Sequence, residues 1–251
     1  MNRYFFEISY DGTEYHGWQR QENAISVQEV VEEALSTVLK TKMSVVGSGR
    51  TDTGVHCEQQ FFHLDIDESV DTSGLLYRLN SFLPKDISIG SIQQVQEDGH
   101  SRFSAISRSY EYRINLRKSP FYKLYSYYYR KSPDLDSMNA AAHLLIGEHD
   151  FKAFSKVKTE VNNFKCHISH AKWNSSPEKL WFNISANRFL RGMVRAIVGT
   201  LLQVGEGNLS LTDFQKVIES KDRRKASAAA PAHGLFLTKV VYPKTIFLAN
   251  K

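Results

Sequence analysis

The spacing of hydrophobic residues changes along this chain, and each change predicts a different element. Residues 3–10 are rich in aromatic side chains and end at the turn pair Asp11-Gly12, which predicts a strand. After Ser26 the apolar residues recur at every third or fourth position, which predicts a helix with one buried face. Ser26 and Glu29 have the spacing of a capping box, in which the hydroxyl and the carboxylate satisfy backbone amides of the first turn.

Further apolar runs complete a first group of elements. Short strands are predicted at residues 44–46, 60–64 and 87–92, and a helix is predicted at residues 75–83, where Pro84 stops it. With the first strand and helix, these runs give the order β-α-β-β-α-β, which is typical of a ferredoxin-like half.

A second group of elements follows and varies the same order. Strands are predicted at residues 109–116, 125–129, 166–173, 180–186 and 235–241, and helices at 137–146, 189–204 and 211–218. The predicted fold class is therefore α+β, with two ferredoxin-like halves, residues 1–100 and 101–251, that share a central, mainly antiparallel sheet flanked by helices. We expect an active-site cleft between the halves and a hinge between Pro84 and Ser107.

The composition is that of a folded, mildly basic protein. The chain has 251 residues, 41% of them hydrophobic, and its 32 Lys and Arg against 27 Asp and Glu leave a net charge of +5. This apolar content excludes an intrinsically disordered chain, and no apolar run approaches the roughly 18–20 residues of a membrane helix. Two cysteines, Cys57 and Cys166, suit a reducing compartment, so we predict a cytoplasmic location and no membrane partner.

The most unusual stretch is the loop at residues 47–54, Gly-Ser-Gly-Arg-Thr-Asp-Thr-Gly. Its glycines allow sharp turns and close backbone approach, so its single carboxylate, Asp52, can be directed into a cleft. The alternative is a tight turn in which Asp52 caps backbone amides. The loop lacks the Gly-Lys-Ser/Thr ending of a P-loop, which excludes that kind of phosphate site.

Two patterns could suggest a metal site. His56-Cys57-Glu58 matches the His-x-Glu half of a zinc deaminase site, but the Pro-Cys-x-x-Cys half is missing from the sequence. Cys166-His167 lacks the further spaced ligands that a zinc site needs. We therefore predict no metal. A metal-dependent base-modifying enzyme stays an alternative that rests on His56 and Glu58 alone.

Arginines and tyrosines gather in the second half of the chain. Arg188, Arg191 and Arg195 are spaced i, i+3, i+7 and would form one stripe on the predicted helix, which suits either a solvated face or a nucleic-acid contact. Tyr110 and Tyr112 are two apart on a predicted strand and share one side of it. Such rings suit stacked RNA bases, and they equally suit packing of a sheet against helices. Packing is our interpretation of Tyr125, Tyr127, Tyr128 and Tyr129.

Five short motifs lie in order along nearly the whole chain. They are YDGTEYHGWQ at residues 10–19, GRTDTGVH at 49–56, SRSYEY at 107–112, FLRGMVR at 189–195 and APAHGL at 230–235. Together they closely resemble the tRNA pseudouridine synthase A family. Departures are small. Thr53 and Cys57 stand where alanine is common in the family, and residues 227–229, Ser-Ala-Ala, match less closely the Gly- and Thr-containing stretch that is usual there.

The resemblance implies a reaction and roles for three residues. The reaction breaks the N-glycosidic bond of a uridine in tRNA, turns the base and rejoins it through carbon, without metal or cofactor. Asp52 matches the nucleophile, whether it attacks the sugar or the base. A buried carboxylate tends to protonate, and Arg195 matches the cation that keeps it charged. Tyr110 matches the tyrosine that stacks on the target base, and Tyr112 is the less favoured alternative.

The resemblance also implies the substrate and the assembly. Arg50 is similar to the arginine that enters the RNA and assists base flipping, and Arg188 and Arg191 are expected to contact the substrate. That substrate is the tRNA anticodon stem-loop, with the uridines at tRNA positions 38, 39 and 40. A homodimer with one tRNA spanning both subunits is expected. The alternative is a catalytically silent tRNA-binding protein, which would keep the basic and aromatic surface but need no intact pair of Asp52 and Arg195.

Overall fold

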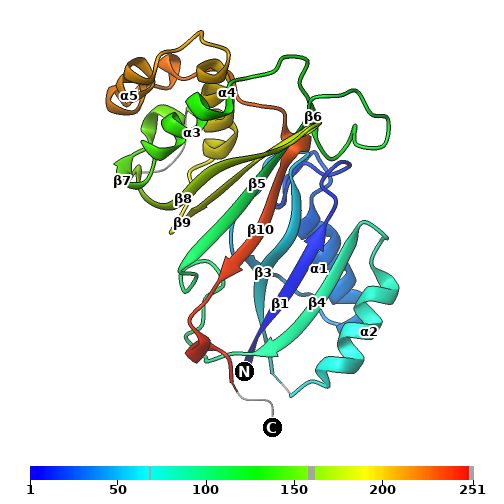
Figure 1. Cartoon of the computed structure of the whole chain (residues 1–251). Helices are drawn as coiled ribbons and strands as arrows, with labels where there is room; N and C mark the ends of the chain where they lie inside the picture. Colours follow the sequence, from blue (N-terminus) through cyan, green and yellow to red (C-terminus); the bar gives the residue numbers. More distant parts are fainter. Residues whose placement is uncertain (68, 158–161, 249–251) are drawn as a thin grey trace. The chain divides into compact units, whose positions relative to one another are not determined.

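The computed structural model describes residues 1–67, 69–157 and 162–248 (Figure 1). The predicted fold class, α+β, is confirmed, since these residues contain ten strands and five α-helices. The chain divides into two compact units. Unit 1 is Met1–Ile106 together with Leu237–Lys251, and unit 2 is Ser107–Phe236. None of the helices in the described residues combines the length and apolar character needed to cross a membrane.

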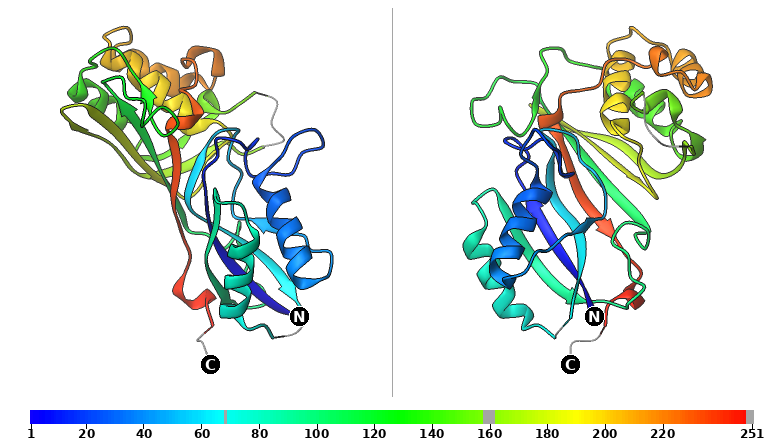
Figure 2. Two further views of the ribbon diagram at one scale, coloured as in Figure 1. Left: turned by 90° about the vertical axis from the view of Figure 1, so that its right-hand side faces the viewer. Right: turned by 180° about the vertical axis from the view of Figure 1, so that it is seen from behind.

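Unit 1 follows the order predicted for a ferredoxin-like half. Its elements are β1 (Asn2–Tyr10), α1 (Val27–Leu39), β2 (Val46–Gly47), β3 (His56–Ile66), α2 (Thr72–Phe82) and β4 (Ile87–Gln94). β1 lies between β4 and β3 and is antiparallel to both, and β2 pairs with β3. Both helices cover the same face of this sheet (Figure 2). On that face the rings of Phe6 and Phe62, opposite each other in register, stack with centroids 4.8 Å apart.

The start of α1 shows how local chemistry sets an element boundary. The Oγ of Ser26 accepts a hydrogen bond of 3.3 Å from the amide of Glu29, as the capping-box spacing predicts. The carboxylate of Glu29 lies 3.5 Å from the guanidinium of Arg20. Val31 and Leu35 are buried on the apolar face, so the predicted amphipathic helix is confirmed.

The other face of the unit 1 sheet is covered by the end of the chain. Residues 237–241 belong to β10 (Leu235–Val241), the neighbour of β3. Beyond it, the rings of Tyr242 and Phe247 lie 5.1 Å and 6.1 Å from the ring of Phe5. This face is therefore closed by residues that lie far from the rest of unit 1 in sequence.

His63 is a buried titratable group in this layer. Its side chain is 5% exposed, and its Nδ1 lies 2.8 Å from the Oγ of Ser101. Burial is the main cause that lowers the pKa of His63 to about 4, and the charges of His100 and Arg3 lower it further, against a small opposing effect of Asp65. The imidazole is therefore neutral in the folded chain at neutral pH.

The low pKa of His63 predicts a loss of stability in mild acid. Between about pH 4 and about pH 6.5 the unfolded chain binds a proton that the folded chain does not, so the free energy of unfolding falls as the pH falls through this window. His63→Gln removes this contribution, whereas the Arg3–Asp65 ion pair is common to both proteins. Urea midpoints measured across the window are expected to fall more steeply for the wild type than for the variant. Parallel profiles would contradict the prediction.

Unit 2 is built mainly on antiparallel strands. Its elements are β5 (Ser107–Asn115), β6 (Tyr127–Tyr128), α3 (Leu135–His143), β7 (Gly147–Asp150), β8 (Lys165–Ser176), β9 (Lys179–Ala186), α4 (Met193–Gly205) and α5 (Leu211–Ser220). The strands lie in the order β5-β9-β8-β7, and β6 pairs in parallel with β5. β7 was not predicted, because its sequence Gly-Glu-His-Asp carries no apolar pattern and only its pairing with β8 defines it.

Two expectations for unit 2 are wrong. The helix predicted from residue 189 begins at Met193, because Gly192 at its N-cap has a φ of 70°. Arg188 and Arg191 therefore precede α4, and no stripe with Arg195 exists on that helix. The tyrosines of residues 125–129 do not all serve as sheet packing either: Tyr129 is buried, whereas Tyr125 and Tyr128 are exposed.

Candidate active site

The loop between β2 and β3 is fixed at its start by hydrogen bonds to β3. The amide of Ser48 donates to the carbonyl of Phe61 at 2.7 Å, and the Nε2 of Gln60 donates to the carbonyl of Gly49 at 3.1 Å. Gln60 is 0% exposed, so these bonds form away from water. The loop therefore leaves β2 in a set direction.

Asp52 lies at the start of a tight turn in this loop. The amide of Val55 donates to the carbonyl of Asp52 at 3.1 Å, and Gly54 has a φ of 74°. The side chain of Asp52 is half-buried, while that of Arg50 is exposed and donates from Nε to the Oε1 of Gln19 at 3.1 Å. The turn that the glycine pattern predicted is present, and it holds the carboxylate and the arginine on one short loop.

Residues 11–19 pack directly on this loop through two glycines. A Cβ on Gly12 would lie 2.0 Å from the carbonyl oxygen of Val55, and a Cβ on Gly17 would lie 2.2 Å from that of Thr51. Gly17 also has a φ of 85°, a conformation that favours glycine. Two of the sequence motifs thus fit together, backbone against backbone, around Asp52.

A buried hydroxyl joins the two motifs. The hydroxyl of Tyr10, at the end of β1, lies 2.8 Å from the Oγ1 of Thr51 and donates to the Oε1 of Gln60 at 3.1 Å. The side chains of all three residues are buried. Sequence analysis did not single out Tyr10 or Gln60 as positioning residues; the signal available was a glutamine directly before the aromatic pair Phe61-Phe62 of β3.

Unit 2 carries Tyr110 and Tyr112 in β5, where they differ in environment. The ring of Tyr110 is half-buried and meets the ring of Phe189 edge-on, with centroids 5.1 Å apart. Tyr112 is fully buried, its hydroxyl donates to the carbonyl of Pro231 at 2.9 Å, and burial raises its pKa. Tyr110 is therefore the better placed of the two to meet a ligand.

Arg195, in α4, is held by a segment that contains the last of the five motifs. Its Nε donates to the carbonyl of Ala230 at 2.7 Å, and its own carbonyl accepts from the amide of Ala230 at 2.9 Å. Gly199 allows this close contact, since a Cβ there would lie 2.0 Å from the carbonyl oxygen of Ala228. Arg188 is half-buried and Arg191 is exposed, both before α4.

The predicted site residues thus fall into two groups, one in each unit. Asp52 and Arg50 lie in unit 1, and the second group, in unit 2, consists of Tyr110, Arg188, Arg191 and Arg195. The expected pairing of Asp52 with Arg195 joins the two units and stays a prediction.

The histidine and cysteine patterns are used within the fold. The Nδ1 of His56 accepts a hydrogen bond of 3.1 Å from the amide of Gly12. Burial raises the pKa of Cys57 and raises that of Cys166 to about 11, so both are unreactive thiols at neutral pH. Over residues 1–67, 69–157 and 162–248 there is no group of three or more His, Cys, Asp or Glu that could hold a metal ion. The predicted absence of a metal stays a prediction.

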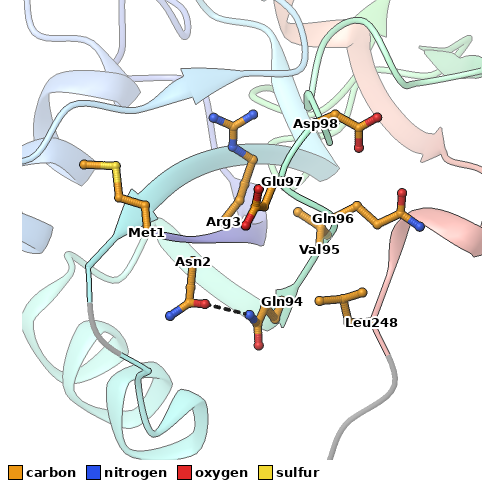
Figure 3. A pocket seen from close by; sticks show the side chains of 9 residues that line it. All are labelled: Met1, Asn2, Arg3, Gln94, Val95, Gln96, Glu97, Asp98 and Leu248. Atoms are coloured by element: carbon orange, nitrogen blue, oxygen red, sulfur yellow. Dashed lines mark hydrogen bonds between the residues drawn. The ribbon is translucent and has the colours of Figure 1, made fainter.

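A hollow of about 510 Å³ in unit 1 is lined by other residues (Figure 3). Among these, Asn2 and Gln94 are joined by a hydrogen bond of 3.1 Å, and Arg3 donates to Asp65 through two nitrogens, each at 2.7 Å. The charge of Arg3 is therefore already neutralised by Asp65. The lining of the hollow contains none of the predicted site residues.

Comparison with known proteins identifies a family over most of the chain. A model of the tRNA pseudouridine synthase family matches residues 8–104 and 141–243. The chain is 49% identical over 253 residues to tRNA pseudouridine synthase A of Porphyromonas gingivalis, covering 99% of this chain and 100% of that protein. It is 48% identical over 250 residues to the protein of the same name from Bacteroides thetaiotaomicron, covering 98% and 93%. It is 39% identical over 239 residues to the protein of that name from Bacillus licheniformis, covering 94% of this chain and 97% of that protein.

Proposed function

The chain belongs to the tRNA pseudouridine synthase family, whose activity is an isomerisation, and we propose that it converts uridines of the tRNA anticodon stem-loop to pseudouridine with Asp52 as the nucleophile. The proposed targets are the uridines at tRNA positions 38, 39 and 40. The observation that carries the assignment is the fixed loop. Asp52 starts a turn that buried hydrogen bonds and two close glycine contacts hold in place, as a nucleophile requires.

The proposed reaction balances without a cofactor. The bond between N1 of uracil and C1′ of ribose breaks, the base turns while it is held, and a bond between C5 and C1′ forms. A proton leaves C5 and one is gained at N1, so substrate and product have the same atoms. Asp52 attacks either C1′ or the base carbon C6, and a site closed to water protects the intermediate.

Two residues of unit 2 complete the proposed chemistry. Arg195 keeps the carboxylate of Asp52 ionised, since a nearby cation favours the charged form. Tyr110 stacks on the uracil and exchanges the proton at C5. Its half-buried ring, fixed edge-on by Phe189, supports this role over Tyr112, whose hydroxyl is engaged by Pro231.

The RNA must present its uridine outside the stem, which costs a few kcal/mol. Arg50, exposed two residues before Asp52, is the residue we assign to assist this flip. Arg188 and Arg191 are assigned to contact the substrate, where they would position it without reading its sequence. We further infer a homodimer and a cytoplasmic location, the latter supported by two buried cysteines that form no disulfide with each other.

A tritium-release assay tests the proposed function. Unmodified tRNA transcripts that carry tritium at C5 of uridine are expected to lose it to water when the purified protein is added, and mapping of the product places the modified positions. Tight tRNA binding without tritium release would favour a catalytically silent binding protein. Activity that survives exhaustive EDTA would remove the metal-dependent alternative.

The hydroxyl of Tyr10 provides a separate prediction for the positioning of Asp52. Tyr10→Phe leaves buried polar atoms of Thr51 and Gln60 without a partner, so we expect kcat to fall about tenfold with KM little changed. Tyr4→Phe is the matched control, because the hydroxyl of Tyr4 in the same strand accepts from the amide of Val70 at 3.3 Å. Equal kcat values in the two variants would contradict a positioning role.

A further inference from the structure

The segment between β5 and α3 combines exposed rings with positive charge. Residues 117–131, the aromatic–basic segment, contain Arg117, Lys118, Lys123, Arg130 and Lys131 and no Asp or Glu. Within it, Phe121 is 85% exposed, Tyr122 44% and Tyr128 38%. Figure 1 shows it as the extended loops that lead into and out of β6. Exposed apolar side chains that gather in one patch mark interaction sites, whereas single exposed ones do not.

The backbone of the segment is fixed at several points. The amide of Leu116 donates to the carbonyl of Glu178 at 2.9 Å, and β6 pairs with β5. Between these points the carbonyl of Tyr122 accepts from the amide of Tyr125 at 3.0 Å and from the Oγ of Ser126 at 3.1 Å. The rings therefore stand on an ordered turn and need little ordering when a partner binds.

Cations lie against two of the exposed rings. The Nζ of Lys179 is 4.2 Å from the centroid of Tyr122, and the guanidinium carbon of Arg130 is 5.9 Å from that of Tyr128. Such contacts orient a ring and place a positive charge beside it. Proteins that bind single-stranded nucleic acid combine such positive charges, which attract the backbone, with exposed rings, on which bases stack.

Several of these charges have no counter-ion among the residues that the structure describes. Arg117 pairs with Glu178 at 3.0 Å, and Lys131 pairs with Glu206. Lys118, Lys123 and Arg130 are exposed and form no ion pair with any of the described residues. Cations left in this state attract a polyanion and release its counter-ions on contact.

We propose that the aromatic–basic segment is an RNA-contact surface, on which Tyr122 and Phe121 stack unpaired bases of the substrate tRNA while Lys118 and Lys123 contact its phosphates. The proposal rests on the proposed function for the identity of the RNA. A second copy of this chain fits less well. In a symmetric dimer the same patch meets itself, which would bring lysines against lysines, and protein interfaces are depleted in lysine.

Equilibrium binding of an unmodified tRNA transcript tests the stacking. Tyr122→Ala is expected to raise Kd about tenfold, the loss of one stacked base, whereas Tyr122→Phe keeps the ring and binds as the wild type does. Tyr77→Ala is the control, since Tyr77 on α2 is 75% exposed and lies outside the segment. Equal affinities of Tyr122→Ala and Tyr77→Ala would overturn the proposal.

The salt dependence tests the charges. Lys118→Gln combined with Lys123→Gln is expected to lower the slope of log K against log salt concentration by about 1.4 to 1.8 if both contact phosphate. The control is Lys42→Gln, at an exposed position between α1 and β2, which should leave the slope unchanged. An unchanged slope overturns the proposal. A shift to a slower-sedimenting, monomeric species with unchanged tRNA affinity also overturns it, because that result would assign the surface to self-association. The binding readout does not depend on turnover, so failure of the proposed isomerisation appears separately, as absent tritium release by the wild type.

Discussion

Asp52→Asn is expected to abolish pseudouridine formation while tRNA binding is retained. Asparagine keeps the size and shape of the side chain but cannot act as a nucleophile, so the single-turnover rate at saturating enzyme should fall by at least about 10³-fold. In the turn at Asp52 the amide of Val55 donates to the carbonyl of Asp52, and the substitution does not remove this backbone bond. Affinity for the transcript should stay within about twofold of the wild type or rise slightly, because a negative charge near the RNA is removed.

Glu58→Gln is the matched control for this experiment. It removes one carboxylate from an exposed position at the start of β3, six residues after Asp52, and should leave turnover unchanged. The same variant tests the metal-dependent alternative, for which Glu58 would be the essential acid. Wild-type turnover by Asp52→Asn would remove the assignment of the nucleophile, and loss of turnover by Glu58→Gln would revive the alternative.

Gly17→Ala should destabilise unit 1 and disable the loop together. At a φ of 85°, alanine costs about 1–2 kcal/mol, and the overlap of its Cβ with the Thr51 carbonyl oxygen adds about 1–3 kcal/mol. We therefore expect the free energy of unfolding to fall by about 3 kcal/mol and Tm by about 6–12 °C. Because the oxygen can only move with the backbone next to Asp52, turnover should fall even at temperatures where the variant is fully folded.

Two other glycines separate these effects. Gly207 has a φ of 74° and nothing within 4 Å of an added Cβ, so Gly207→Ala reports the backbone cost alone, about 1–2 kcal/mol. Gly49 lies in the loop itself with open space around an added Cβ, so Gly49→Ala should be neutral or slightly stabilising. Urea denaturation and turnover of the three variants check the prediction. A loss of stability by Gly17→Ala no larger than that of Gly207→Ala would contradict the clash.

The parts of the fold that the sequence predicted are those set by neighbours in the chain. The start of α1 depends on Ser26 and on the residues just after it, and the end of α2 on Pro84. The start of α4 depends instead on the positive φ of Gly192, which composition does not show. β7 has no pattern of its own and exists because β8 pairs with it.

The candidate site divides in the same way. The glycine-rich loop and its carboxylate could be found because their residues are contiguous. The role of the Tyr10 hydroxyl could not be found in this way, because its partners lie 41 and 50 positions away in the sequence and only folding brings them together. The exposure of Tyr128 beside buried Tyr129 was also hidden, since a two-residue strand gives no period from which to assign faces.

The return of residues 237–248 to unit 1 has a consequence for synthesis on the ribosome. Unit 2 is continuous in sequence, from Ser107 to Phe236, so it can emerge whole and fold as one piece. Unit 1 begins first but receives its last pieces only after unit 2 has been synthesised, when residues 237–241 join β3 and Tyr242 covers Phe5. Until then its sheet keeps an unpaired edge and a solvent-exposed aromatic face. The N-terminal part of the nascent chain is therefore the last to have its sheet edge paired and its aromatic face buried.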